Sequence, residues 1–450
     1  MAIAIALIGL ALGSVLFHFL SPWYFTPIAS NWHAIDTTIA ITFWVTGVVF
    51  VALSVFMAWA VIRFRHREGG RAAYQPENKK LEWWLMVVTA GGVAAMLAPG
   101  LLVWADIIHV PGNATEVEVV AQQWNWTYRL PGKDGKLGTV DSRFVSDDNP
   151  LGMNSADPNG ADDVLVFNPE LHLPLGLPVK LLLRSKDVLH DFTVAQFRVK
   201  MDMVPGLVTY TWFIPTRAGS YDLLCEELCG IGHFAMRGRV VVEEPAAYQA
   251  WLGRQSTYAQ VGARPAGDAV AGKASYAVCA ACHGAAGEGN LALNAPKLSG
   301  QGAWYLARQL RQFKLGARGT HEKDVFGKQM APMAATLADD AAIANVVAYI
   351  ATLPDTPAAT TIQGSVEAGR LRFATCAACH GADGRGVAAT NAPRIHGMSD
   401  WYMARQLKNF KDGVRGAHPQ DIYGGQMALI SGMLADDAEI GDILAYVNSR

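Results

Sequence analysis

Charged residues are scarce in this chain, and basic residues are not in excess. Only 17% of the 450 residues are charged, while 51% are hydrophobic; soluble domains average about 25% charged residues. The 37 basic and 39 acidic side chains leave a formal net charge of −2, which gives no reason to expect a nucleic-acid partner. Six cysteines are too few for a disulfide scaffold of this length. The composition therefore argues against both an ordinary cytoplasmic enzyme and a disulfide-stapled protein.

The shortage of charge is concentrated at the N-terminus, where the first 62 residues hold one charged side chain, Asp36. Uncharged runs cover 1–20, 39–61 and 83–104, and each can cross about 30 Å of hydrocarbon as a helix. The first run lacks the basic start and the clean cleavage motif of a secretory signal, so we favour a retained helix over a removed signal. We expect a transmembrane region over 1–110, with helices at about 1–20, 39–62 and 82–108.

The loops around these runs predict their orientation. The connection at 21–36 has no Lys or Arg. The connection between the second and third runs holds Arg63, Arg65, Arg67, Arg71, Lys79 and Lys80. Because basic loops stay in the cytoplasm, everything after about Ile108 lies outside. We therefore expect an inner (plasma) membrane protein of a bacterium with its larger part on the periplasmic side.

From residue 115 the hydrophobic pattern changes to a period of two. Short β-branched or aromatic runs lie between Pro/Gly turns at 115–121, 179–184, 209–215, 221–225 and 239–243. Such runs are typical of strands packed in a sandwich. We expect an all-β domain over 111–250.

A cluster of soft ligands follows one of these strands. Cys225, Cys229, His233 and Met236 lie within twelve residues, and His190 lies upstream. Thiolate, imidazole and thioether ligands suit copper. Two thiolates can bridge two copper ions with one histidine for each, and Met236 and the carbonyl of Glu227 would be weak outer ligands. A Cys225–Cys229 disulfide and a Cys2His2 zinc site are the alternatives, and neither explains Met236.

This loop, the upstream histidine and the aromatic cluster Gln123-Trp124-Asn125-Trp126-Thr127-Tyr128 resemble subunit II of haem-copper cytochrome c oxidases. The resemblance implies a cupredoxin fold that holds the dinuclear CuA centre. The CuA ligands would be His190, Cys225, Cys229, His233, Met236 and the Glu227 carbonyl.

The same resemblance implies roles for three further side chains. The Glu227 carboxylate would reach a magnesium ion at the interface with subunit I. Trp124 would lie on the electron-entry surface, and Glu82 would lie at the mouth of a proton channel into subunit I. Read without the family, Glu82 is an acid at a helix start and Trp124 is an ordinary core or surface aromatic residue.

The C-terminal part of the chain repeats itself at an offset of 97 residues. Cys279, Cys282 and His283 in the first copy correspond to Cys376, Cys379 and His380 in the second. The C-x-x-C-H pattern is the attachment signature of c-type haem, whereas a thioredoxin-like redox pair would need a βαβ context that is missing. Helical periodicity in both copies predicts two all-α domains, over 268–354 and 364–450, each binding one haem c.

Each haem iron needs a sixth ligand downstream of its C-x-x-C-H motif. Met330 and Met427 occupy equivalent positions in the repeat, so they are the predicted ligands, with core methionines as the alternative. His321 and His418 also correspond, and we interpret them as loop residues. The two copies are similar to class I cytochromes c, especially di-haem ones, and His/Met ligation raises the haem potential.

These parts together predict a multidomain membrane protein with transmembrane helices, a cupredoxin domain and two cytochrome c domains. We expect the electron-entry subunit of a cytochrome-c oxidase. It would pass electrons from a soluble cytochrome c or an upstream respiratory complex through two haems and CuA to subunit I, which reduces O2 to water and translocates protons. Subunits I and III would be partners. A subunit of a haem-copper nitric oxide reductase is the alternative. An enzyme similar to nitrous oxide reductase would need a second, histidine-rich copper cluster, and the histidines of this sequence are too scattered to form one.

Overall fold

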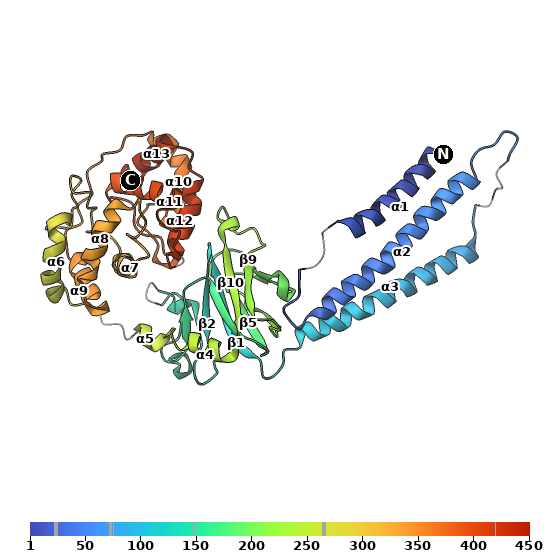
Figure 1. Ribbon diagram of the computed structural model, residues 1–450, viewed down its shortest axis with the longest axis horizontal. Helices are drawn as coiled ribbons and strands as arrows, with labels where there is room; N and C mark the ends of the chain where they lie inside the picture. Colours follow the sequence, from blue (N-terminus) through green and yellow to red (C-terminus); the bar gives the residue numbers. More distant parts are fainter. Residues whose placement is uncertain (22–25, 72–73, 75, 147–148, 263–266, 419) are drawn as a thin grey trace.

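The computed structural model describes residues 1–21, 26–71, 74, 76–146, 149–262, 267–418 and 420–450. Within these residues, three helices are long and apolar enough to span a membrane: α1 (Ala2–Leu20), α2 (His33–Arg63) and α3 (Lys79–Ile108). Their side chains are largely exposed in the isolated chain. Figure 1 shows all three extending away from the rest of the protein, with the α2–α3 connection at the remote end. The apolar helices expected at the N-terminus are therefore confirmed.

Polar and aromatic contacts join these helices to the β domain. Asp36 near the start of α2 forms an ion pair with Arg198, with an N–O distance of 2.6 Å. Trp212 donates its indole N–H to the carbonyl of Ile107 near the end of α3, at 2.9 Å, and its own carbonyl accepts the indole N–H of Trp32, also at 2.9 Å. These bonds fix α2 and α3 on one end of the β domain.

The β domain is a sandwich of two sheets, as the period-two pattern predicts. One sheet has the strand order β11–β3–β2–β1–β5–β8, and the other has the order β4–β10–β9–β6–β7. The first sheet contains β1 (Thr115–Gln122), β2 (Asn125–Leu130), β3 (Val164–Val166), β5 (Val179–Ser185), β8 (Thr209–Phe213) and β11 (Ser256–Thr257). The second contains β4 (Glu170–Pro174), β6 (His190–Val194), β7 (Val199–Met203), β9 (Gly219–Leu224) and β10 (Arg237–Glu243).

A buried charge network lies inside the first sheet. Arg129 on β2 stands opposite Glu118 on β1, and its guanidinium bonds to Glu118 at 2.7 Å and to Asp163 at 2.6 Å. Arg184 on β5 also pairs with Glu118, at 2.6 Å. Buried charges are tolerated only when they are paired in this way, so the network ties the neighbouring strands β1, β2 and β5 together.

After α4 (Pro245–Leu252) and α5 (Tyr258–Gly262), the chain forms two similar helical domains. The first contains α6 (Ala269–His283), α7 (Ala303–Lys314), α8 (Val325–Ala335) and α9 (Asp340–Ala351), and the second contains α10 (Val366–His380), α11 (Asp400–Lys411), α12 (Ile422–Gly432) and α13 (Asp437–Asn448). The first and last helices cross at Gly272 and Gly369, where a Cβ atom would collide with the carbonyl of Asn345 or Asp442. The repeat therefore extends to the helix crossing.

One residue of the connecting segment ties the two helical domains together. Asp355 accepts a bond from the buried Lys297 of the first domain at 2.7 Å and pairs with Arg394 of the second at 2.5 Å. Although partial burial opposes the shift, hydrogen bonds from these two cations hold the pKa of Asp355 below its usual range. Asp355 therefore links the two helical domains through one ion pair to each.

Candidate functional site

The predicted copper ligands converge at one end of the second sheet. Strand β9 ends immediately before Cys225, β10 begins immediately after Met236, and the neighbouring β6 begins with His190. The Sγ atoms of Cys225 and Cys229 lie 3.7 Å apart. His190 Nδ1 lies 3.9 Å from Cys225 Sγ, and His233 Nδ1 lies 3.6 Å from Cys229 Sγ. Each thiol therefore has one histidine nitrogen beside it.

The candidate outer ligands, Met236 and the carbonyl of Glu227, lie beside the same two sulfur atoms. Met236 Sδ is 3.9 Å from Cys229 Sγ, and the carbonyl oxygen of Glu227 is 3.3 Å from Cys225 Sγ. All six cysteines of the chain, every one within a described segment, are free thiols. The separated sulfurs with soft donors on both sides fit a bridged pair of copper ions better than a disulfide.

Asp187 orients the first histidine. His190 is fully buried, and its Nε2 lies 2.8 Å from Asp187 Oδ1. If Nε2 carries the proton and donates it to this carboxylate, Nδ1 is left unprotonated toward the sulfurs, as a metal ligand requires. Burial by itself would lower the pKa of His190, but the hydrogen bond with Asp187 and the charge of its carboxylate raise it. Asp187 also accepts the backbone N–H of Gln123 at 2.7 Å, so it connects the copper loop to the aromatic cluster.

The two thiols differ in acidity. The hydrogen bond from the Cys229 thiol lowers the pKa of Cys225 strongly, with help from His190. The same bond raises the pKa of Cys229. The pair therefore favours one thiolate hydrogen-bonded to one thiol, and thiolates are the metal-binding form of cysteine.

Trp124 lies between the copper loop and the second helical domain. Its indole N–H donates to the carbonyl of Cys229 at 3.1 Å, and the side chain of Gln123 donates to the same carbonyl at 2.8 Å. On its other side, the carbonyl of Trp124 accepts the side-chain N–H of Gln426 on α12, at 2.7 Å. Trp124 is consequently buried, and the surface on which electrons were expected to enter is covered by the chain's own C-terminal domain.

The two C-x-x-C-H histidines have matching surroundings. His283 and His380 are buried, and each places Nδ1 2.7 Å from a proline carbonyl, that of Pro296 or Pro393. This bond fixes Nδ1 as the protonated nitrogen and leaves Nε2 for a metal. Burial lowers the pKa of both imidazoles, which favours the neutral form that ligates iron.

Both predicted methionines line the same cavity as these histidines. Met330 lies on α8 and Met427 on α12, and the cavity is also lined by the cysteines of both motifs. His321 and His418 are not among its lining residues; each instead accepts a backbone N–H in its own loop, from Lys323 or Gln420. Met330 and Met427 therefore share a cavity with the motif histidines, whereas His321 and His418 lie in loops outside its lining.

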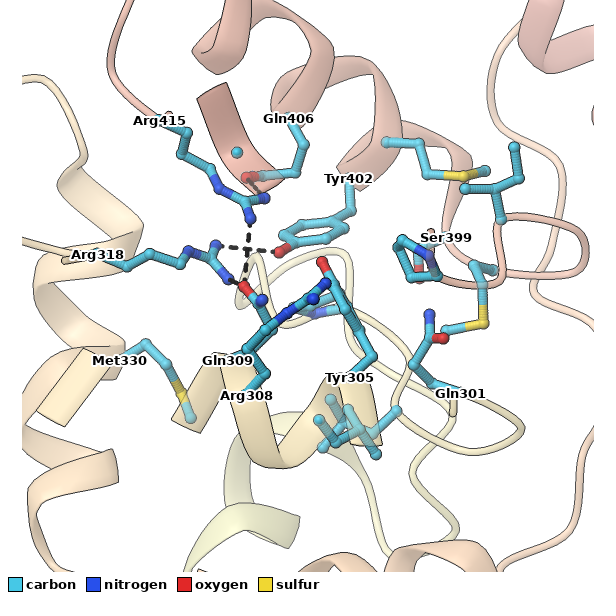
Figure 2. A pocket seen from close by; sticks show the side chains of 18 of the residues that line it. Gln301, Tyr305, Arg308, Gln309, Arg318, Met330, Ser399, Tyr402, Gln406 and Arg415 are labelled. Carbon is cyan, nitrogen blue, oxygen red and sulfur yellow. Dashed lines mark hydrogen bonds between the residues drawn. The ribbon is translucent and has the colours of Figure 1, made fainter. Parts of the chain in front are cut away.

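Arginines from both helical domains meet in this cavity, a feature that the sequence analysis missed. Figure 2 shows Arg318 and Arg415 pointing from opposite domains toward Gln309 and Tyr402. Arg415 donates to Gln309 at 3.2 Å, and Arg318 donates to Tyr402 at 3.3 Å. The Nε atoms of Arg308, Arg318, Arg405 and Arg415 are buried and find no hydrogen-bond partner within the described part of the chain.

Such orphaned cationic donors require acidic acceptors. A haem in each half of the cavity would bring carboxylates, its propionates, to an arginine-lined interior. The residues present therefore fit two c-type haems. The missed signal was the repeat itself, because Arg308 and Arg318 recur 97 residues later as Arg405 and Arg415.

Glu82 lies outside these redox sites, in the membrane helix α3, whereas Glu227 belongs to the copper loop itself. Glu82 is in the first turn of α3, where its carboxylate faces the backbone N–H of Asn78 at 3.4 Å. Glu227 pairs with Lys200 at 3.2 Å on the outer side of the copper loop. The structure thus shows a helix-capping position for the first and an ion pair for the second.

Comparisons with known proteins match both parts of the chain. The family described as "Cytochrome C oxidase subunit II, periplasmic domain" matches residues 115–244, and the cytochrome c family matches 269–354 and 366–450. The alternative cytochrome c oxidase subunit 2 of Bradyrhizobium diazoefficiens is 60% identical over 266 residues, covering 59% of this chain and 96% of that protein.

Other similar proteins match the C-terminal half. Cytochrome c4 of Azotobacter vinelandii is 36% identical over 165 residues, covering 34% of this chain and 77% of that protein. The crystal structure of reduced cytochrome c4 from Pseudomonas stutzeri has a TM-score of 0.34 and 27% identity, covering 40% of this chain and 98% of that one.

Proposed function

The chain belongs to the cytochrome c oxidase subunit II family, and we propose that it is the electron-entry subunit of a bacterial respiratory haem-copper oxidase. It passes electrons from a cytochrome donor to subunit I, where O2 is reduced to water and protons are translocated. CuA and two c-type haems supply one-electron redox centres when bound. Subunits I and III are the proposed partners in the inner membrane, with the cupredoxin and cytochrome c domains on the periplasmic side.

The contact at Trp124 is the observation that carries this proposal. The second cytochrome domain lies on the cupredoxin domain, with Gln426 bonded to Trp124 and Cys379 packed against the core that contains the copper ligands. Trp124 in turn is bonded to the backbone of Cys229. Short, continuous packing of this kind is what an electron-transfer interface needs, and it has no purpose in a copper-delivery protein.

We assign the metal ligands as the sequence predicts them. His190, Cys225, Cys229, His233, Met236 and the Glu227 carbonyl hold CuA. Cys279, Cys282, His283 and Met330 hold the haem of the first cytochrome domain. Cys376, Cys379, His380 and Met427 hold that of the second. Asp187 is added as the residue that fixes the tautomer of His190.

Two further assignments concern protons and magnesium. Glu82 is the proposed proton-entry residue, and its place at the cytoplasmic start of α3 supports this role. The Glu227 carboxylate is the proposed magnesium ligand at the interface with subunit I. Lys200 now pairs with it, so magnesium would have to displace this ammonium group.

Substitution of the axial methionines tests the haem assignment. Met330→Ala and Met427→Ala should each abolish, for one haem, the weak red absorption band that a thioether ligand gives ferric haem, and should lower that haem's potential. Met433→Ala is the matched control, because Met433 is the C-cap residue of α12, is 52% exposed and does not line the cavity. An unchanged spectrum in the Met330 variant would reassign the ligand.

The terminal acceptor is tested on the purified complex. With reduced cytochrome c as donor, we expect O2 uptake and a CuA signal in the electron paramagnetic resonance spectrum. Robust NO consumption without O2 uptake would instead support the nitric oxide reductase alternative. A β domain that binds zinc, or no copper, would contradict the CuA assignment independently of turnover.

A further inference from the structure

Two arginines reach from one cytochrome domain into the other. Arg405 on α11 of the second domain donates to Asn294 of the first, from Nη1 to Oδ1 at 2.7 Å and from Nη2 to the backbone carbonyl at 3.5 Å. Arg308 on α7 of the first domain donates to Asn391 of the second in the same way, at 3.1 Å and 3.0 Å. Figure 2 shows Arg308 among the side chains that line the cavity. The exchange between the domains is therefore reciprocal.

The contacts of Arg405 place it beside the ligand-bearing segments of the first domain. Its guanidinium lies over the ring of Phe326, 4.2 Å from the ring centroid, and Phe326 precedes Met330 by about one turn of α8. Asn294 is two residues before Pro296, whose carbonyl bonds to the motif histidine. Arg405 therefore contacts the first domain on both its methionine side and its histidine side.

Arg308 makes the same contacts with the second domain. Its guanidinium lies over the ring of Tyr423, 4.6 Å from the ring centroid, and Tyr423 precedes Met427 by about one turn of α12. Asn391 is two residues before Pro393, whose carbonyl bonds to the motif histidine of that domain. Each domain thus receives one arginine from its neighbour at the equivalent place.

The other two arginines of the cavity are held differently. Arg318 and Arg415 each make one bond across the domain boundary, but each guanidinium stacks on a phenylalanine of its own domain, at 4.3 Å. The guanidinium groups of Arg308 and Arg405 instead lie nearer to a ring of the opposite domain than to the rings of their own. We call Arg308 and Arg405 the crossing arginines.

Each crossing arginine has one donor left over. The asparagine takes both terminal nitrogens, and the Nε atoms of Arg308 and Arg405 are buried without a hydrogen-bond partner among the described residues. Asp421 attracts Arg308 and Asp324 attracts Arg405, yet no hydrogen bond joins either pair in that part of the chain. Burial lowers the pKa of both guanidinium groups. A buried cationic donor of this kind destabilises the fold until an anion accepts it.

We propose that each crossing arginine binds a carboxylate of the haem in the opposite domain, Arg405 for the first haem and Arg308 for the second. The inference rests on the proposed function, which places one c-type haem in each domain. Positive charge beside a haem raises the haem potential, because reduction adds one negative charge that the cation stabilises. The charge that sets each potential then comes from the other domain, and neither cytochrome domain is a complete redox unit by itself.

The test is a redox titration of the purified full-length chain with its haems and copper bound. In a Met427→Ala background only the first haem keeps a thioether ligand, so the weak red absorption band of ferric haem reports the first haem alone. A Met330→Ala background reports the second haem in the same way. The haem content of every variant is measured as the pyridine haemochrome.

Arg405→Gln should shift the first haem toward its oxidised form, although the substitution lies in the second domain. We expect the ratio of reduced to oxidised haem at a fixed potential to fall about tenfold, which is about 59 mV for a one-electron couple, while the second haem changes far less. Arg405→Lys keeps the charge and should restore most of the shift, which a merely structural role would not allow. Arg308→Gln should give the mirror result.

Lys408→Gln is the matched control for Arg405→Gln. Lys408 is also on α11 and its substitution removes the same charge, but it pairs with Asp437 at 2.6 Å, its side chain is 47% exposed and it does not line the cavity. Because solvent screens this charge, both haem potentials should stay unchanged.

Several results would overturn the proposal. An unchanged first-haem potential in Arg405→Gln, with both haems present, excludes contact between this arginine and that haem. A shift of the second haem instead assigns each arginine to the haem of its own domain. An equal shift in Lys408→Gln reduces the effect to unspecific charge.

A second variant covers the case in which Arg405→Gln loses haem. Asn294→Gly frees the guanidinium of Arg405 but keeps its charge, and glycine tolerates the left-handed backbone of Asn294, whose φ is 55°. The first haem's potential should fall by less than in Arg405→Gln. An unchanged potential in this variant contradicts the proposal as well.

Failure of the proposed function gives a different result. A wild-type chain without covalent haem in both cytochrome domains contradicts the proposed function itself. Two haems per chain, with potentials that none of the arginine variants moves, contradict only the assignment of the crossing arginines.

Discussion

The cupredoxin domain and the cytochrome domains place their cofactor ligands against different kinds of core. Cys225, Cys229 and Met236 belong to a large buried cluster that also contains Trp126, Phe192 and other strand residues. The core of the second cytochrome domain is small, with Phe373, Ile443 and Val447 as its buried members. Ile443 and Val447 also line the cavity. The copper ligands thus belong to a core that exists without metal, whereas the core of each cytochrome domain borders a cavity that a haem would fill.

The largest effect should come from removing a haem attachment. Cys279→Ala together with Cys282→Ala should halve the haem content and leave the buried core of the first cytochrome domain packed against an empty cavity, so that it no longer folds cooperatively. Haem content is measured as the pyridine haemochrome, and folding by limited proteolysis.

The matched variant is Cys225→Ala with Cys229→Ala, which removes the copper thiolates. It should lose the CuA signal while its strands stay resistant to protease. A protease-sensitive sandwich in this variant, or a resistant first cytochrome domain in the other, would contradict the comparison.

A smaller but still large effect is expected inside the sandwich, away from copper. Arg129→Leu leaves Glu118 and Asp163 buried without their shared partner, which should cost about 3–5 kcal/mol of unfolding free energy. Amide hydrogen exchange of β1 and β2 measures this loss, with copper content unchanged. The control is Arg143→Leu: Arg143 forms an exposed ion pair with Asp141, and we expect little change.

The smallest effect concerns the ion pairs of Asp355, which link the two cytochrome domains. Because the pKa of Asp355 is lowered in the folded protein, its contribution is fully present above the ordinary aspartate pKa and is lost as pH falls through the folded value. Asp355→Asn should therefore loosen the domain pair at neutral pH by about 1 kcal/mol or less, and wild type should approach the variant only in acid. Small-angle scattering of the oxidase complex across this pH range checks both statements. A contact between the cytochrome domains that weakens toward alkaline pH would disprove them.

The sequence predicted chemistry more completely than packing. The soft-ligand loop and the C-x-x-C-H motifs are defined by residue type and spacing, and both can be read directly from the sequence. The apolar helices and the sandwich were predicted for the same reason. Strands β2, β3, β4, β6, β7 and β11 were not predicted. His190 and the aromatic cluster were interpreted as site residues rather than as strand residues, and β3 and β11 are only three and two residues long.

Contacts between domains were beyond the sequence analysis. Nothing in the local pattern distinguishes Gln426, which bonds to Trp124, from its exposed counterpart Gln329. The difference arises only when one copy packs on the cupredoxin domain and the other does not. The arginines in the haem cavity were missed because the sequence does not show whether an arginine is buried or exposed. Their recurrence at the repeat offset of 97 residues was visible.

The bond between Gln426 and Trp124 also bears on why a cytochrome is joined covalently to its acceptor. Gln426–Trp124 and Tyr423–Asn125 are hydrogen bonds between the second cytochrome domain and the cupredoxin domain, and two such bonds alone would give only weak, short-lived association between separate proteins. Joining two modules in one chain, here through the first cytochrome domain, raises the local concentration of one around the other. A contact too weak to survive dilution is then occupied most of the time, and it can still open and close quickly between successive electrons.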